Sequence, residues 1–190
     1  MKTPVLAAAA ALALAGCATT APTGDARTAI IQRTANGVPH ITAPDMETLA
    51  YGVAYAHAQD NVCQTAQQLL TVRGERSRYL GPTAAALLGR RVLPNEQIDI
   101  FIAAHMDDAA LARGWAAASA DAQAMVRGYV AGYNRFLADQ GSQLPAACKG
   151  KAWVQPMTAA HFYRLNEVSS VQAGIGALAD AMLADRKSVV

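Results

Sequence analysis

Charged side chains, aromatic side chains and familiar catalytic motifs are all scarce in this sequence of 190 residues. Charged residues make up 16% of the chain and its net charge is +2, which excludes the polyelectrolyte surface of a typical nucleic-acid-binding protein. The chain has no Gly-x-Ser-x-Gly nucleophile elbow, no glycine-rich phosphate loop and no paired-cysteine zinc motif. Its four histidines show no triad spacing with its serines. The sequence therefore shows neither a complete active site nor a metal centre, and we expect no nucleic-acid partner.

The first residues have the pattern of a bacterial export signal. Residues 1–2 form a short basic head, residues 5–14 are an apolar run too short to span a bilayer as a permanent helix, and Leu-Ala-Gly-Cys at residues 14–17 resembles a lipobox. We expect residues 1–17 to be a lipoprotein signal that is cut before Cys17. The sulfur of Cys17 would then carry the lipid that anchors the protein.

Residues 18–27 are small and polar, and we expect them to form a tether. Alanine rather than aspartate follows Cys17, which resembles the pattern of lipoproteins sent on to the outer membrane. We therefore expect a periplasmic protein anchored to the outer membrane of a Gram-negative bacterium. The alternative is an ordinary secretory signal that is cut near Ala18 or Ala21.

Two of the three cysteines remain once Cys17 is set aside. In an oxidising compartment an even number of cysteines favours pairing, so we expect a disulfide between Cys63 and Cys148. The closed loop would be long, and the chain-entropy model then gives roughly 4 to 5 kcal/mol of stabilisation. Two separate buried thiols are the alternative.

The stretch Tyr51–Gly81 predicts one long helix, which Asp45 would cap and Gly74 would interrupt. Apolar residues recur there at steps of three and four, the spacing of one helical face: Leu49, Val53, Ala56, Cys63 and Leu70. Asp60 lies on the same seam, and a carboxylate on a packing face is costly unless it is paired. We expect Asp60 to be a buried polar anchor for another element, and a catalytic acid is the alternative.

Shorter elements are predicted around this helix. β-Branched residues on either side of the turn Ala35-Asn36-Gly37 favour a short hairpin. Capping residues and helical spacing indicate three further helices, and a loop precedes the first of them. The predicted segments are a hairpin over residues 28–42, helices from Pro94 through Ala109, from Ser119 to Gly141 and after Thr158, and a loop over residues 144–156.

Three arginines surround a single glutamate near the end of the long helix. Arg73, Arg76 and Arg78 lie within two or three positions of Glu75. This arrangement predicts an ion-pair cluster, either solvated or between helices. A site for a substrate anion is the alternative.

Four motifs between Ile30 and Gly81 resemble, in their order and spacing, the start of the penicillin acylase family. Its members are amide hydrolases with an N-terminal nucleophile. The wording of the last two motifs is most similar to the acyl-homoserine-lactone and aculeacin A acylases, and the resemblance extends to about Ala184. The motifs are Gly37-Val38-Pro39-His40-Ile41, Tyr51-Gly52-Val53-Ala54-Tyr55-Ala56, Ala58-Gln59-Asp60-Asn61 and Arg73-Gly74-Glu75-Arg76-Ser77-Arg78.

The resemblance implies an α+β fold. The whole enzyme would have the αββα architecture of N-terminal-nucleophile hydrolases, and this piece would be predominantly helical with a short N-terminal hairpin. Residues 28–184 would be the short-subunit region of a precursor. In the family the nucleophile is a serine at the start of a second, larger subunit, where its own α-amino group acts as the base. No serine of this chain has that context, so we assign no catalytic residue here and expect the larger subunit as a partner.

The resemblance also implies an acyl-amide substrate, either a long-chain acyl-homoserine lactone or lipopeptide or a penicillin. It implies no cofactor, although the complete enzyme has room for a structural calcium. The last predicted helix carries small and polar residues that could line the acyl pocket, namely Ser169, Ser170 and Gly174. Close packing of helices is the alternative for that face. A different class of function, a non-catalytic helical lipoprotein that binds a protein partner, also fits a chain without a nucleophile.

The last residues of the chain resemble a translated sequencing adapter. Residues 185–190 read Asp-Arg-Lys-Ser-Val-Val. We therefore expect the natural sequence to diverge after Ala184. Genuine basic residues that cap a helix are the alternative.

Overall fold

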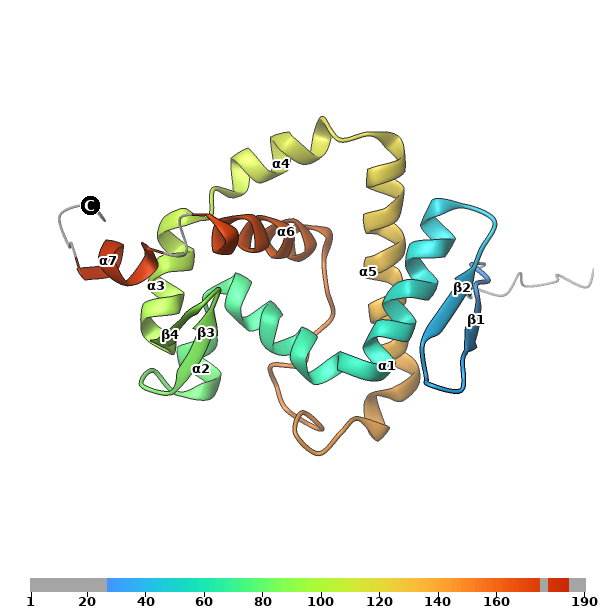
Figure 1. Cartoon of the computed structure of the whole chain (residues 1–190), viewed down its shortest axis with the longest axis horizontal. Coiled ribbons are helices and arrows are strands. Elements are labelled where there is room, and N and C mark those ends of the chain that lie inside the picture. The colour runs from blue at the N-terminus through green and yellow to red at the C-terminus, as the bar shows by residue number, and fades with distance from the viewer. Residues whose placement is uncertain (1–26, 175–177, 185–190) are drawn as a thin grey trace, which may run out of the picture.

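Helices form most of the chain in the computed structural model, which describes residues 27–174 and 178–184 (Figure 1). The described part also contains two antiparallel hairpins, each a two-stranded sheet of its own. A predominantly helical piece with an N-terminal hairpin was predicted, and both features are confirmed. The predicted signal with Cys17, most of the tether and the adapter-like residues 185–190 lie outside the described residues.

The first hairpin pairs β1, Ile30–Arg33, with β2, Pro39–Thr42. The strands are antiparallel, with Ile30 opposite Thr42 and Arg33 opposite Pro39. Gly37 turns the chain with φ 81°, a left-handed conformation that glycine adopts without steric cost. The Arg33 guanidinium donates to the Gly37 carbonyl at 2.8 Å and fastens the turn.

Helix α1, Met46–Arg73, begins and ends at the predicted caps. The Asp45 carboxylate accepts a hydrogen bond from the Thr48 amide at 2.7 Å, and Gly74 adopts the left-handed conformation at the C-terminus. A short helix, α2, follows at Arg76–Leu80. One feature was not predicted: the backbone at Asn61 is non-helical, with φ −136° and ψ 22°, and kinks α1 there.

A second hairpin was missed from the sequence. β3, Ala85–Leu88, pairs with β4, Arg91–Pro94, where a loop was expected. The predicted helix through Ala109 is also wrong in length, because it is two helices: α3, Asn95–His105, and α4, Asp108–Ala116. The Asp107 carboxylate accepts from the amides of Ala109 and Ala110 at 2.9 and 3.0 Å, so it caps a new helix rather than lying inside the old one.

The remaining helices have the predicted caps. The Ser119 hydroxyl caps α5, Ala120–Gln140, and the Thr158 hydroxyl caps α6, Ala159–Ala173. A single 3₁₀ turn, η1, follows α5 at Gly141–Gln143, and the chain then runs without helix or strand to Thr158. Helix α7, Ala179–Ala184, is the last described element. In Figure 1, α6 lies between α4 and the C-terminal half of α1, and it contacts α1, α4 and α5.

The buried core lies where α1, α3 and α5 meet the loop before α6. Its largest fully buried side chains include Leu69 and Leu70 of α1, Phe101 of α3 and Tyr133 of α5. Phe136 packs edge to face on Tyr55, with ring centroids 5.5 Å apart. Within the residues that the structure describes, none of the helices has the length and apolar character needed to cross a bilayer.

Candidate functional site

Helix α6 carries two of the residues proposed from the sequence for an acyl pocket. Ser169 and Ser170 are exposed, and their hydroxyls donate to the carbonyls of Leu165 and Asn166 one turn earlier, at 2.9 and 3.2 Å. Neither hydroxyl contacts a histidine or another base in these hydrogen bonds. Both serines are therefore held as wall residues and not as nucleophiles.

Ser169 lines a hollow of about 890 Å³ between α1, β3 and α6, which we call the α1–α6 hollow. Ser170 and Gly174 do not line it. The volume is in the usual range for ligand sites. Its walls mix glutamine, threonine and serine side chains with apolar ones. The lining residues are Gln64, Thr65, Gln67, Gln68, Thr71, Val72, Arg76, Ala85, Ala86, Leu87, Gly89, Tyr129, Phe162, Leu165, Asn166, Val168, Ser169 and Gln172.

Arg76 contributes a buried cation to the α1–α6 hollow. The residue is 8% exposed, and its Nε donates to the Asn95 amide oxygen at 2.8 Å. Its Nη1 donates to the Thr71 hydroxyl at 3.1 Å and to the Gln67 carbonyl at 3.4 Å. Burial lowers the pKa of Arg76, and the nearby Asp99 carboxylate opposes that shift.

The arginine motif is thus not one ion-pair cluster. Arg73 does pair with Glu75, with Nε and Oε2 2.7 Å apart. Arg78 is exposed and lies over the Tyr79 ring at 5.2 Å. Arg76 differs from both because its printed partners are neutral and it faces a cavity. The three residues therefore have three different environments.

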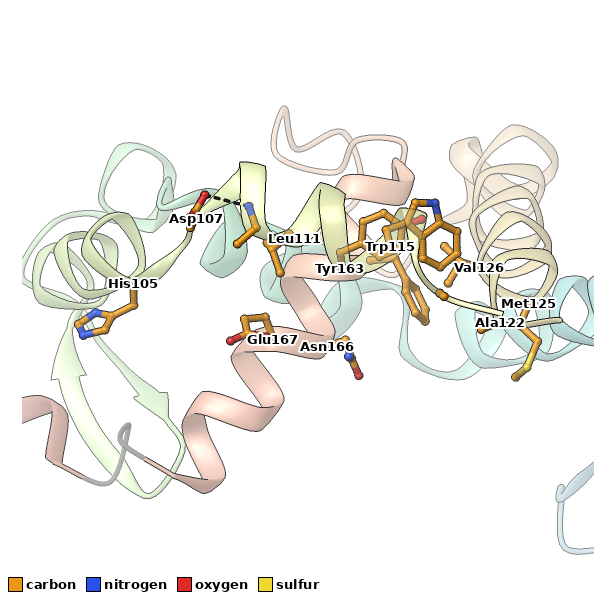
Figure 2. A pocket seen from close by; sticks show the side chains of 14 residues that line it. His105, Asp107, Leu111, Trp115, Ala122, Met125, Val126, Tyr163, Asn166 and Glu167 are labelled. Carbon is orange, nitrogen blue, oxygen red and sulfur yellow. Dashed lines mark hydrogen bonds between the residues drawn. The ribbon is translucent and has the colours of Figure 1, made fainter. Parts of the chain in front are cut away.

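A second cavity, of about 590 Å³, lies between α4, the start of α5 and α6, and we call it the α4 cavity. Figure 2 shows Trp115 and Tyr163 together on facing helices, with their ring centroids 4.2 Å apart. His105 and Asp107 lie at the other end, and Glu167 lies on α6. Burial raises the pKa of Tyr163 to about 12. Sequence reasoning missed this cavity because its walls come from three helices that periodicity does not place together.

Arg164 fixes α6 in relation to both cavities. Its Nε and Nη2 donate to the two carboxylate oxygens of Asp108 at 2.8 and 2.6 Å, and its Nη1 donates to the Val72 carbonyl at 2.8 Å. The first pair of bonds joins α6 to α4, and the third joins α6 to the end of α1. The bidentate bonding gives the contact a defined geometry.

The expectation that Asp60 is buried is wrong. Its side chain is 47% exposed, and one carboxylate oxygen accepts from the Arg33 guanidinium at 3.1 Å. Arg33 also donates to the Gln59 amide oxygen at 2.9 Å. The seam that carries Asp60 faces the first hairpin rather than the core, so Asp60 joins the hairpin to α1 through an exposed ion pair. We assign it no catalytic role.

Cys63 and Cys148 are joined in the structure by a disulfide, with their Cα atoms 5.4 Å apart. Cys63 follows the kink in α1, and the buried Cys148 lies in the loop between α5 and α6. The disulfide therefore holds that loop against the middle of α1. Over the part of the chain that the structure describes, no three His, Cys, Asp or Glu side chains come together as metal ligands, so we place no calcium on these residues.

Comparison with known proteins gives a consistent result. Residues 28–185 match the family model described as penicillin amidase. The chain is 43% identical over 152 residues to the acyl-homoserine lactone acylase PvdQ of Pseudomonas syringae pv. tomato, covering 80% of this chain and 19% of that protein. It is 40% identical over 159 residues to the aculeacin-A acylase of Actinoplanes utahensis, covering 82% of this chain and 20% of that protein.

The structural comparison points the same way. A thermostable penicillin G acylase from Alcaligenes faecalis superposes with a TM-score of 0.67 at 26% identity, and the match covers 86% of this chain and 83% of that chain. The chain thus spans about a fifth of the length of the two sequence relatives but most of the length of the solved chain.

Proposed function

This chain belongs to the penicillin amidase family, and from that premise we propose that it is the N-terminal, short-subunit part of an acylase precursor. The complete enzyme would hydrolyse the amide bond of N-acyl substrates. In that reaction the amide C–N bond breaks, water supplies the hydroxyl of the released acid, and a proton goes to the leaving amine. The observation that carries the proposal is the family match over residues 28–185.

Two coverage values support a separate short subunit. The chain covers 19% and 20% of the two acylases compared by sequence, yet 83% of the matching chain of the penicillin G acylase structure. A region of this size therefore exists as a chain of its own in one family member. We infer that the nucleophilic serine lies in a larger subunit from the same precursor, and that the complete enzyme has the αββα fold.

The names of the relatives support an N-acyl substrate. One acts on acyl-homoserine lactones and another on aculeacin A, and a penicillin acylase 2 proenzyme of a Pseudomonas species is 31% identical over 115 residues. We propose long acyl chains as the preferred group. A hollow walled by small residues suits such chains, because each buried methylene contributes about 0.8 kcal/mol and a bulky wall residue would shorten the channel.

The proposed role of this chain is to bind and orient the acyl group, not to attack the amide. Ser169 lies in the wall of the α1–α6 hollow, and the bond from its hydroxyl to the Leu165 carbonyl satisfies the donor that would otherwise compete with an apolar chain. Arg164 holds the helix that carries this wall. Substrate orientation of this kind accounts for a large part of many enzymatic rate enhancements.

The experiment compares the chain produced alone with the complete precursor, both assayed against decanoyl-homoserine lactone and penicillin G. We expect no turnover by the chain alone and a preference of the complete enzyme for the decanoyl substrate. Turnover by the chain alone would contradict the two-subunit proposal. A complete precursor that cleaves no N-acyl amide would overturn the acylase proposal and favour a protein-binding lipoprotein.

We also propose lipid anchoring at Cys17 in the outer membrane, on the sequence pattern of residues 14–17. Metabolic labelling with an alkyne analogue of palmitate should mark the wild-type protein. The Cys17→Ala variant should remain unlabelled. Equal labelling of the two proteins would refute the assignment, and membrane fractionation of the labelled protein would then test its location.

A further inference from the structure

The α1–α6 hollow contains a cation that no carboxylate balances directly. Arg76 is the charged residue among those that line it, and the lining includes no aspartate or glutamate of the described chain. Its Nε and Nη1 are bonded to Asn95, Thr71 and the Gln67 carbonyl, all neutral groups. Its Nη2 makes no hydrogen bond to any residue that the structure describes. One face of a buried guanidinium is therefore free to bind a ligand.

The nearest acidic side chains are occupied elsewhere. The two oxygens of Asp99 accept from the backbone amides of Arg76 and Ser77, at 3.0 and 2.7 Å. Glu75 pairs with Arg73. A buried charge without a partner of opposite sign is costly, and a bound anion would remove that cost. The lowered pKa of Arg76, caused by its burial, agrees with this cost.

We propose that the α1–α6 hollow binds a carboxylate on Arg76, so that the complete enzyme prefers acyl chains that end in a carboxylate over alkyl chains of equal length. The substrates would be monoamides of long dicarboxylic acids. The proposal rests on the proposed function, because it takes Ser169 and Arg76 as two walls of one acyl site. It names the far end of the acyl chain, which the family relationship leaves open.

The chemistry of the walls fits such a chain. A guanidinium binds a carboxylate through parallel N–H donors, and the bond is stronger in a site with little water. Leu87, Leu165 and Val168 offer apolar surface for the methylene groups. The α4 cavity makes a useful contrast, since Asp107 and Glu167 line it without any lysine or arginine. Of the two cavities, the α1–α6 hollow is the one suited to an anion.

The test uses the mature enzyme made from the complete precursor. The p-nitroanilide of decanoic acid is compared with the mono-p-nitroanilide of sebacic acid, which has the same chain length and a terminal carboxylate. The wild type should favour the sebacoyl compound in kcat/KM. Arg76→Met should lower kcat/KM for that compound by roughly 10- to 100-fold, because a hydrogen-bonded charge is lost. Turnover of the decanoyl compound should stay within about threefold.

Two further variants separate binding from folding. Gln68 is exposed and lines the hollow, so Gln68→Glu adds a repelling charge without touching the bonds of Arg76. It should also lower sebacoyl turnover selectively. Arg76→Lys should restore part of the preference, since it returns the charge without the paired donors. Arg78→Met, at an exposed arginine two positions away, is the matched control and should change neither substrate.

Calorimetric titration with free sebacate gives a readout that does not depend on turnover. Binding to the wild type that is lost in Arg76→Met and in Gln68→Glu would support the site even if neither anilide were cleaved, in which case the proposed function would fail alone. Decanoyl turnover with no sebacoyl preference and no sebacate binding would overturn the carboxylate site and leave the acylase intact. Equal loss of both activities, or failed subunit assembly, in Arg76→Met would also overturn it and identify Arg76 as a structural residue.

Discussion

Gly132 of α5 lies so close to the carbonyl group of Tyr51 in α1 that a Cβ atom at residue 132 would overlap it. Gly128 stands in the same relation to Glu47 one turn earlier. The two glycines therefore let the backbones of α1 and α5 touch. This contact sets the position of α1, and with it the position of Gln64, Gln68 and the other α1 residues in the wall of the α1–α6 hollow.

Gly132→Ala should consequently destabilise the protein. The neighbour of the new methyl group is backbone, which cannot rotate away, so we expect a loss of about 2 to 3 kcal/mol in the free energy of unfolding. Gly141→Ala is the matched control, because nothing lies within 4 Å of its Cβ position and its φ is −54°. Urea unfolding measures both variants. Equal stability of the two would contradict the backbone contact.

A second prediction concerns acid stability at Glu47. Its carboxylate accepts from Arg27 at 2.6 Å and from Arg127 at 3.1 Å, and these bonds lower its pKa below 4.5, the bond from Arg27 being the larger cause. Because the folded-state pKa is the lower one, the stabilisation is complete above the unfolded-state pKa. It is lost as the pH falls through the folded-state value.

Glu47→Gln should therefore be less stable than the wild type near neutral pH, and the difference should shrink on acidification below about pH 4.5. Thermal unfolding followed across that range measures it. Asp121→Asn is a suitable control, since Asp121 is an exposed acid in the first turn of α5. A difference between wild type and Glu47→Gln that stays constant with pH would contradict the assigned ion pairs.

The sequence predicted the helix boundaries better than the contacts between helices. Asp45, Gly74, Ser119 and Thr158 end or begin helices as expected, because caps are local interactions that depend on a few neighbouring residues. The hairpin at Ala85–Leu88 was missed because its strand lacks the β-branched residues that mark strands, and its turn is made by Gly89 at φ 61°. Tertiary contact overrode propensity there.

The site was harder to predict for a related reason. Periodicity placed Asp60 on one face of α1 but could not tell that this face meets a two-stranded hairpin and solvent rather than the core. The arginine motif has the same limit, since Arg73, Arg76 and Arg78 look alike in sequence and differ only in what the fold places beside them. The available signal was the excess of three arginines over one glutamate, which leaves cations without a local partner.

A third prediction concerns the disulfide between Cys63 and Cys148. The two residues are separated by 85 positions, and closing a loop of this length should stabilise the folded state by about 4 to 5 kcal/mol in the chain-entropy model. Reduction, or Cys148→Ser, should lower the free energy of unfolding by an amount of this order. Non-reducing peptide mapping of exported protein should recover the linked peptide pair. Two free thiols in that experiment would rule the disulfide out.

The last prediction separates the two uses of the small-residue face on α6. Ser169 lines the α1–α6 hollow, whereas Gly174 does not and has only the Ser170 and Val171 carbonyls within 4 Å of its Cβ position. Ser169→Phe should therefore fill the hollow and shift the preference of the complete enzyme toward short acyl chains. Gly174→Phe should leave the preference unchanged, because its side chain would lie outside the hollow.

The measurement is kcat/KM for a series of acyl-homoserine lactones from butanoyl to dodecanoyl. Each methylene that Ser169→Phe excludes should cost about 0.8 kcal/mol of binding, or roughly fourfold in kcat/KM, so the loss should grow along the series. A uniform loss at every chain length would instead mean that residue 169 only packs α6 in place. A chain-length shift in Gly174→Phe with none in Ser169→Phe would move the acyl site to the end of α6 and away from the α1–α6 hollow.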